Sequence, residues 1–325
     1  MHTEYNELKY LTFARFIFHT RALNRFRLPI YKGSTFRGGF GNNLKRTVCI
    51  NRNGDCGNCI LQPKCVYSYV FETRPLQDSR VKIDLTDVPR PYVLVPPDTG
   101  KDVFDAEEPF EFSMALFGKA IDYLPYVLFV FQQLGEHGIG RERGRFYIES
   151  VKNERFGDEI EIFNAKTGCL KGNIHIYSSE NFLYLYENLI AMNPKTMRIE
   201  FVTPFRMKID GHLRDDFTFF DFFRSLLNRL YFIARFHCGG DNERRQRELL
   251  ELSKGVEITG RNLRWHDWIR YSSRQKTEMY MGGVVGDFTI SGNLVPFMPF
   301  LKVGEYTHTG KATSMGLGRY SISVK

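Results

Sequence analysis

Three glycines near the C-terminus lie among residues suited to contact a phosphate. Gly310, Gly316 and Gly318 have no side chains, so backbone amides there can approach a phosphate or a stacked base, and Lys311 and Arg319 add positive charge. A Walker-type loop would end on Gly-Lys-Ser/Thr and open a helix. Here the Gly-Lys pair comes first and a strand-like segment follows, which disfavours a nucleoside triphosphate site. We therefore expect an RNA-backbone-binding loop; the alternative is a tight turn whose glycines only supply positive φ.

A second glycine-rich turn, residues 138–145, carries Arg141, Arg143 and Arg145. Two basic glycine turns at matching places in the two halves of the chain favour RNA binding over a purely structural turn. The other basic residues that we expect to contact RNA are Lys32, Arg37 and Arg270.

Four of the six cysteines fall within residues 49–65: Cys49, Cys56, Cys59 and Cys65. Four thiolates that include a Cys-x2-Cys knuckle can close a tetrahedral Zn²⁺ site, and residues 53–55 and 57–58 offer the tight turns that a knuckle needs. All four ligands would come from the protein, so the site would be structural. An iron–sulfur cluster is the alternative occupant, and four reduced free thiols are the alternative without metal.

Histidines are the residues best suited to proton transfer. His308 lies two residues before Gly310, and His266 lies between the two tryptophans of the chain. RNA cleavage by attack of a 2′-hydroxyl on its own phosphate needs a proton acceptor, a proton donor and positive charge, and it needs no metal. His308 with Lys311 meets that need, with His266, Tyr31 or Lys32 as further candidates. A lone histidine is also a common structural residue.

The composition fits a globular protein that binds a polyanion. The chain has 325 residues, 42% of them hydrophobic, so it can bury a large core. Its net charge of +8 and its pI near 9.1 favour a nucleic acid as its partner. The first nine residues are polar and no apolar run is long enough to cross a membrane, so we expect a cytoplasmic protein. In that compartment six cysteines argue against a disulfide framework.

The elements predicted from hydrophobic periodicity recur in the two halves. Each half reads as a strand, a helix, two strands, a helix, a glycine-rich turn and a strand, with residues 268–272 and 286–290 read as a hairpin pair. This is the βαββαβ order of an α+β, ferredoxin-like (RRM-like) fold. We predict two tandem domains of this kind: residues 1–152 with the cysteine knuckle inserted at 49–65, and residues 153–325 with the glycine-rich loop.

Four segments resemble the sixth CRISPR-associated protein family, the pre-crRNA-processing endoribonucleases of the RAMP superfamily. They are residues 31–41 (YKGSTFRGGFG), 201–206 (FVTPFR), 268–275 (WIRYSSRQ) leading to 281–286 (MGGVVG), and 308–320, from HTGK through GLGRY. The segments occur in order across nearly the whole chain, which makes the resemblance specific.

The resemblance implies a protein with two ferredoxin-like domains that binds a CRISPR repeat. It also implies cleavage without metal to a 2′,3′-cyclic phosphate and a 5′-hydroxyl, and retention of the crRNA for a CRISPR effector complex. Relatives place a general-base histidine in or after the first helix, but this sequence has none between His19 and His137. Either His308 or His266 takes that role, or the chain is a crRNA-binding subunit that does not cut. A third alternative is a zinc-knuckle scaffold whose basic surface contacts proteins.

Overall fold

A computed structural model describes residues 8–51, 56–73, 88–98, 100–240, 246–272 and 277–324. The chain divides into two compact units, each taken by itself below. The N-terminal unit comprises Leu11–Tyr177 and Phe232–Gly240; the C-terminal unit comprises Met1–Tyr10, Ser178–Tyr231 and Asp241–Lys325. The predicted boundary at 152/153 falls inside a strand, and both units are discontinuous in sequence.

The N-terminal unit is built on a six-stranded antiparallel sheet in the order β3-β5-β1-β6-β7-β8. Its main elements are β1 (Phe13–Ala22), α1 (Gly33–Val48), β3 (Tyr92–Val95), β5 (Pro109–Phe117), α2 (Leu124–His137), β6 (Phe146–Arg155), β7 (Asp158–Asn164) and β8 (Cys169–Leu170). Shorter ones are β2 (Phe26–Arg27), η2 (Cys56–Asn58), η3 (Gln62–Lys64), η4 (Ser68–Glu72), β4 (Val103–Phe104) and η5 (Gly118–Tyr123). Strands β6, β1, β5 and β3 with α1 and α2 follow the strand–helix–strand–strand–helix–strand order, and β7 and β8 extend the sheet beyond β6.

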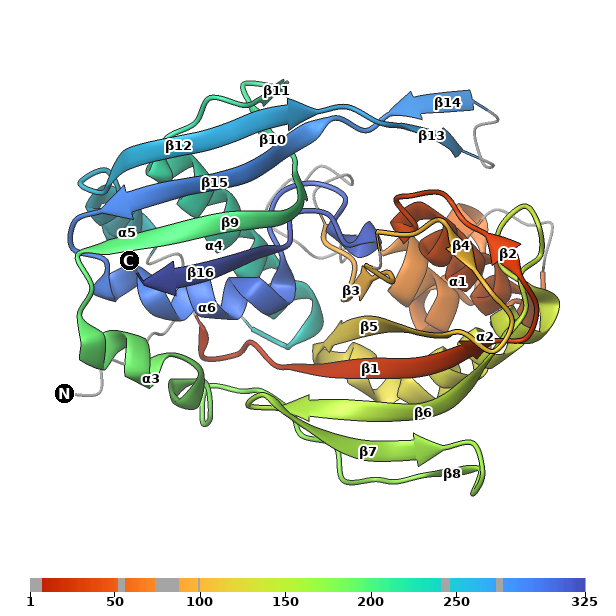
Figure 1. Ribbon diagram of the computed structural model, residues 1–325. Coiled ribbons are helices and arrows are strands. Elements are labelled where there is room, and N and C mark those ends of the chain that lie inside the picture. The colour runs from red at the N-terminus through yellow and green to blue at the C-terminus, as the bar shows by residue number, and fades with distance from the viewer. Residues whose placement is uncertain are drawn as a thin grey trace. The chain divides into compact units, whose positions relative to one another are not determined.

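Aromatic residues fill the space between this sheet and its two helices, which lie on the same side of it (Figure 1). The Phe18 ring of β1 stacks on the Phe112 ring of β5 with centroids 4.6 Å apart, and the Phe40 ring of α1 stacks on the Phe131 ring of α2 at 5.3 Å. Burying each such side chain contributes about 1.5–3 kcal/mol. The alternation of apolar residues along β1 therefore determines which face of the strand meets the helices.

The C-terminal unit contains a four-stranded antiparallel sheet in the order β12-β15-β9-β16. Its main elements are β9 (Thr196–Phe205), α4 (Phe219–His237, whose last residues belong to the other unit), β12 (Glu257–His266), β15 (Gly283–Ser291), α6 (Met298–Thr307) and β16 (Tyr320–Val324). The others are α3 (Leu183–Met192), β10 (Met207–Ile209), β11 (His212–Arg214), α5 (Gln246–Ser253), β13 (Ile269–Ser272), β14 (Thr277–Tyr280), η6 (Val295–Phe297) and η7 (Thr313–Met315). Here too the order is strand, helix, two strands, helix, strand.

The hairpin of this unit differs from the sequence prediction. The segment 286–290 pairs with β12, and residues 269–272 pair instead with 277–280 to form the separate β13–β14 ribbon. The ribbon continues beyond the ends of β12 and β15 (Figure 1). β12 escaped recognition because most of its side chains are exposed, so its sequence lacks a regular apolar alternation. Residues 273–276, which include part of the 268–275 family segment, lie outside the described residues.

Across the described ranges, no helix has both the length and the apolarity that spanning a membrane requires.

Candidate nucleic-acid interface

The glycine-rich loop between α6 and β16 is folded against the end of β9. The Gly318 amide donates to the Pro204 carbonyl (3.0 Å) and the Lys311 amide donates to the Arg206 carbonyl (2.8 Å). The Thr203 hydroxyl donates to the Gly316 carbonyl at 2.7 Å. The amides of Lys311 and Gly318 are thus engaged in holding the loop, and we expect the loop to meet a phosphate through its side chains.

Glycine is required at two places in this loop by backbone geometry. Gly310 has φ +82° and Gly318 has φ +68°. A Cβ at Gly318 would overlap the carbonyl oxygen of Thr309, and a Cβ at Gly310 would lie 2.5 Å from the Arg206 carbonyl oxygen. Both glycines therefore set the loop's position on β9, and that is a structural role whatever the loop binds.

Two arginines lie at the base of the β13–β14 ribbon, close enough for the charge of Arg270 to act on Arg206. Arg206 follows β9 and donates to the Gly282 carbonyl. Burial lowers its pKa, and the positive charge of Arg270 lowers that pKa further, against the opposing effect of Asp267. Arg270 lies in β13 and donates to the thioether sulfur of Met315, in the glycine-rich loop, at 3.3 Å. The loop, the end of β9 and the ribbon thus converge on two neighbouring positive charges.

His308 is buried at the start of the loop. Its side chain is 2% exposed and its Nδ1 lies 3.1 Å from the Leu317 carbonyl oxygen. A carbonyl only accepts, so Nδ1 carries the proton of that hydrogen bond. The imidazole is closed off from solvent, so the predicted role as general base requires the loop to open. Lys311, by contrast, is exposed.

His266 is exposed and lies in the same unit as Arg206 and Arg270. It ends β12 opposite Gly283 of β15. Residues directly opposite in an antiparallel pair share a face, and a Cβ on Gly283 would meet the Phe205 carbonyl oxygen at 2.9 Å and both Arg206 Cγ and Pro204 Cβ at 3.0 Å. His266 therefore lies on the same face of the strands as the Arg206 side chain.

Tyr31 and Lys32 belong to the N-terminal unit and are largely enclosed there. Burial, and secondly the charge of Asp98, raise the pKa of Tyr31, so its phenol stays protonated and cannot act as a base at neutral pH. The Lys32 ammonium donates to the Ile30 carbonyl at 3.1 Å, and burial lowers its pKa. The side chain of Lys32 is almost fully buried, which weighs against a direct phosphate contact.

The remaining predicted RNA contacts in that unit differ in accessibility. Arg37 of α1 packs its guanidinium over the Phe71 ring, 4.3 Å from the centroid. Arg141, Arg143 and Arg145 are exposed on the turn at 138–145, which two backbone hydrogen bonds between Ile139 and Gly144 close. The side chains of these arginines are accessible to a ligand, and their contact with RNA stays a prediction.

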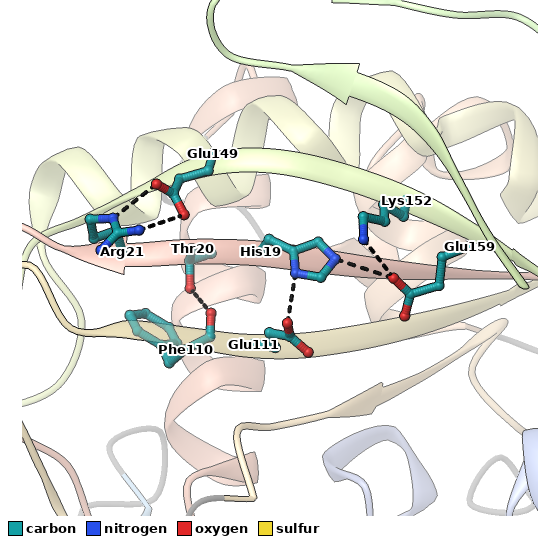
Figure 2. Close-up of polar contacts among 8 residues, drawn as sticks. All are labelled: His19, Thr20, Arg21, Phe110, Glu111, Glu149, Lys152 and Glu159. Carbon is teal, nitrogen blue, oxygen red and sulfur yellow. Dashed lines mark hydrogen bonds and ion pairs between the residues drawn. The ribbon is translucent and has the colours of Figure 1, made fainter.

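The open faces of both sheets carry ion pairs at several described positions. In the N-terminal unit the outward positions of β1, β5, β6 and β7 carry ion pairs: His19 lies 2.7 Å from Glu111, and Arg21 and Lys152 each lie 2.8 Å from a glutamate (Figure 2). In the C-terminal unit the outward positions of β9 include Arg198, which pairs with Asp287 at 3.0 Å. RNA contacts are therefore better sought at the loops than on these strands.

The four cysteines of residues 49–65 follow α1 as free thiols. In the described part of the chain no group of three or more His, Cys, Asp or Glu side chains is arranged to hold a metal ion. The closed four-thiolate site expected from the spacing is thus not preassembled. Residues 53–55, expected to form one of its turns, lie outside the described ranges.

Two arginines of this region were missed as site residues by sequence reasoning. Arg206 ends the FVTPFR segment, and its place directly after a strand was the available signal. Arg229 of α4 is buried, and its Nε donates to the Thr307 carbonyl at 2.7 Å, beside His308. Burial lowers the Arg229 pKa to about 9. Nothing in the helical spacing distinguished Arg229 from the exposed basic residues of α4.

Family models cover most of the chain. Residues 11–175 match the model AF_1859_N, described as an N-terminal domain, and residues 199–320 match the model of the CRISPR-associated endoribonuclease Cas6. The chain belongs to the AF_1859 family, with a Cas6 domain in its second half. The resemblance to the sixth CRISPR-associated protein family is thereby confirmed.

Individual relatives of this Cas6-type chain are distant. An uncharacterized protein of Archaeoglobus fulgidus is 24% identical over 304 residues, which cover 92% of this chain and 93% of that protein. Among solved structures, a Cas6 product complex has a TM-score of 0.55 at 15% identity and covers 96% of this chain and 99% of the other. A partial Cas6-RT-Cas1–Cas2 complex has a TM-score of 0.63 at 12% identity; this chain spans 47% of that longer chain. The shared feature is the fold, a mixed α/β chain with antiparallel sheets.

Proposed function

We propose that this Cas6-type protein binds CRISPR repeat RNA in the C-terminal unit and cleaves it to crRNA without a metal ion. The observation that carries the proposal is that Arg206 and Arg270 both border the glycine-rich loop: the Arg206 carbonyl accepts from the Lys311 amide, and Arg270 donates to the Met315 thioether. Two positive charges that lie near each other and are partly removed from water repel, which raises the free energy of the folded protein. An anion bound between them lowers that free energy. A phosphodiester is the anion that the Cas6 domain match favours.

The proposed reaction uses side chains of this unit alone. A base removes the proton of a ribose 2′-hydroxyl, and the resulting oxygen attacks the adjacent phosphorus. The bond from phosphorus to O5′ breaks, and a protonated group supplies the proton that O5′ takes up. The products are a 2′,3′-cyclic phosphate and a 5′-hydroxyl. Arg206, Arg270 and the exposed Lys311 would stabilise the charge that builds on the phosphate oxygens.

His266 is the histidine that we propose as base, because it is exposed and shares a face with Arg206. His308, predicted first from its place in the sequence, is buried against Leu317, which favours a positioning role. That burial also supports the second candidate function, a crRNA-binding subunit of the same fold that does not cut. RNA retention would then be its whole activity.

Cleavage assays on histidine variants decide between the two functions. Purified protein is incubated with repeat RNA in EDTA, and binding is measured in parallel. His266→Ala should lower the cleavage rate by about 10²–10⁴-fold, the usual contribution of a general acid–base, with unchanged affinity. The matched control is His212→Ala, an exposed histidine in β11. Unchanged cleavage in His266→Ala with loss in His308→Ala would move the base to His308. No cleavage by the unaltered protein that still binds would support the second function.

We propose further that both units are ferredoxin-like domains and that a CRISPR effector complex receives the bound crRNA. The strand orders β6-β1-β5-β3 and β12-β15-β9-β16 support the first statement. The second rests on relatives, whose solved structures are a Cas6 product complex and a Cas6-RT-Cas1–Cas2 complex.

A further inference from the structure

Arg229 is a buried charge that the proposed reaction does not use. It lies within α4 with 9% of its surface exposed, and burial lowers its pKa to about 9. Its Nε donates to the Thr307 carbonyl at 2.7 Å, whereas its Nη2 has no hydrogen-bond partner within the described residues. A guanidinium that is removed from water and incompletely hydrogen-bonded destabilises the folded chain. Its presence at this position therefore points to a role other than stability.

Two contacts join α4 to the start of the glycine-rich loop. Ser225 and Arg229 are four residues apart, so they lie on the same face of the helix. Arg229 donates to the carbonyl of Thr307, the last residue of α6, and the Ser225 hydroxyl lies 3.4 Å from the Thr309 hydroxyl. Thr307 and Thr309 are fully buried. This face of α4 thus contacts the chain on both sides of His308.

The backbone between these two contacts is strained. His308 has φ +55°, a left-handed conformation that residues other than glycine rarely adopt. Such a conformation persists only where the surrounding contacts determine it. Here the contacts are the Arg229 guanidinium on the preceding carbonyl and the hydrogen bond between His308 Nδ1 and the Leu317 carbonyl. The direction in which the chain enters the loop therefore depends on Arg229.

That direction determines where the loop places its RNA-binding groups. Lys311 comes three residues after His308, and its amide donates to the Arg206 carbonyl at 2.8 Å. Further along the loop, the Met315 sulfur accepts from Arg270 at 3.3 Å. A change at the junction of α6 and the loop would therefore move the Lys311 side chain relative to both arginines.

We propose that Arg229 is a positioning residue of the RNA site: its buried guanidinium fixes the junction of α6 and the glycine-rich loop and so places Lys311 beside Arg206. The inference rests on the proposed function, because that function assigns Lys311 to a phosphate. Arg229 does not itself touch RNA. Its effects on stability and on RNA binding should therefore differ in sign when the charge is removed.

The test replaces Arg229 by methionine in the full chain. Chemical unfolding of Arg229→Met should show unchanged or higher stability, because an apolar side chain replaces an incompletely hydrogen-bonded buried charge. Affinity for repeat RNA should nevertheless fall about tenfold, the contribution of one charged hydrogen bond. Amide hydrogen exchange in residues 308–319 should become faster. Arg229→Lys retains a donor for the Thr307 carbonyl and should keep more of the affinity.

The matched control is Arg224→Met, which removes the same charge from a partly exposed position of the same helix. This variant should bind RNA and exchange its loop amides as the unaltered protein does. A double-mutant cycle with Lys311→Ala then shows whether Arg229 acts through the loop. Once Lys311 is replaced, Arg229→Met should lower RNA affinity little further.

Three results would overturn the proposal. Losses of RNA affinity that simply add in the double variant would mean that Arg229 does not act through Lys311. Unaltered loop exchange and affinity in Arg229→Met would remove its positioning role. Failure of Arg229→Met to fold, or lower stability in proportion to the lost affinity, would leave it a purely structural residue. If the unaltered protein does not bind repeat RNA, the proposed function fails, and loop exchange in Arg229→Met still decides whether Arg229 fixes the junction.

Discussion

Arg206 and Arg270 are the residues on which RNA binding depends most in this account. Burial and the charge of Arg270 lower the pKa of Arg206. The two charged side chains therefore have a higher electrostatic free energy without an anion than with one. Arg270 donates to the thioether sulfurs of Met315 and Met279, which are weaker acceptors than a phosphate oxygen. Both arginines are thus prepared for an anionic ligand.

Replacing either arginine should weaken RNA binding and reduce its salt dependence. For Arg206→Ala or Arg270→Ala we expect the slope of log affinity against log salt to fall by about 0.7 per lost phosphate contact with single-stranded RNA. The measurement is a binding titration of repeat RNA at several salt concentrations. Arg21→Ala removes the same charge from the ion-paired face of the other unit and should change neither quantity. Equal losses in all three variants would mean that only net charge matters.

His175 should make the N-terminal unit sensitive to acid. Burial, and secondly the charge of Arg155, lower the His175 pKa below its ordinary 6.5, against the effect of Glu154. Protonation is then easier in the unfolded chain, so His175 should reduce stability as the pH falls below about 6.5 and have no such effect above it. Urea unfolding at about pH 7.5 and about pH 5 should show a smaller acid loss in His175→Leu. The exposed His137→Leu is the control and should follow the unaltered protein.

At the scale of elements, the loop between α6 and β16 depends on glycine more than on any charged side chain. Gly318→Ala should destabilise the folded state by about 1–3 kcal/mol or more, because alanine at φ +68° is strained and its Cβ would overlap Thr309. Chemical unfolding measures the loss, and RNA affinity should fall with it. Gly172→Ala, at a position where a Cβ meets nothing within 4 Å, should be nearly neutral. Equal stability of the two variants would contradict the fold of the loop.

Elements with regular apolar spacing were predictable from the sequence, and exposed ones were not. The Phe36, Phe40 and Leu44 stripe correctly predicted α1, and these residues are buried in the core. β12 and its pairing with β15 were missed because the strand exposes most of its side chains. The division of the chain after Tyr177 could not be obtained from local patterns, and the predicted boundary at 152/153 falls inside β6, which continues to Arg155 and pairs with β7.

Some features of the candidate site could be predicted from the sequence, and others depend on the three-dimensional fold. The charge of Arg270 and the glycines of the loop were visible in the sequence. The burial of His308 and the pairing of Arg206 with Arg270 depend on strands far apart in the chain, so no spacing rule revealed them. Whether Lys32 and Arg37 contact RNA stays a prediction.

At the scale of the whole molecule, the charge of +8 and the Cas6 domain favour the same class of ligand. The open face of the N-terminal sheet carries ion pairs, as on β1 (Figure 2). RNA recognition should therefore be dominated by backbone contacts at loops and by a strong salt dependence. A protein-binding scaffold would show almost no such dependence.

The most direct test of the central claim is the end chemistry of repeat RNA incubated with the protein in EDTA. We predict a single cut that leaves a 2′,3′-cyclic phosphate on one fragment and a 5′-hydroxyl on the other, with the rate strongly reduced in an Arg206→Ala/Arg270→Ala variant and unchanged in Arg21→Ala. Cleavage that stops when Mg²⁺ is removed, or that the double variant performs at the unaltered rate, would contradict the account.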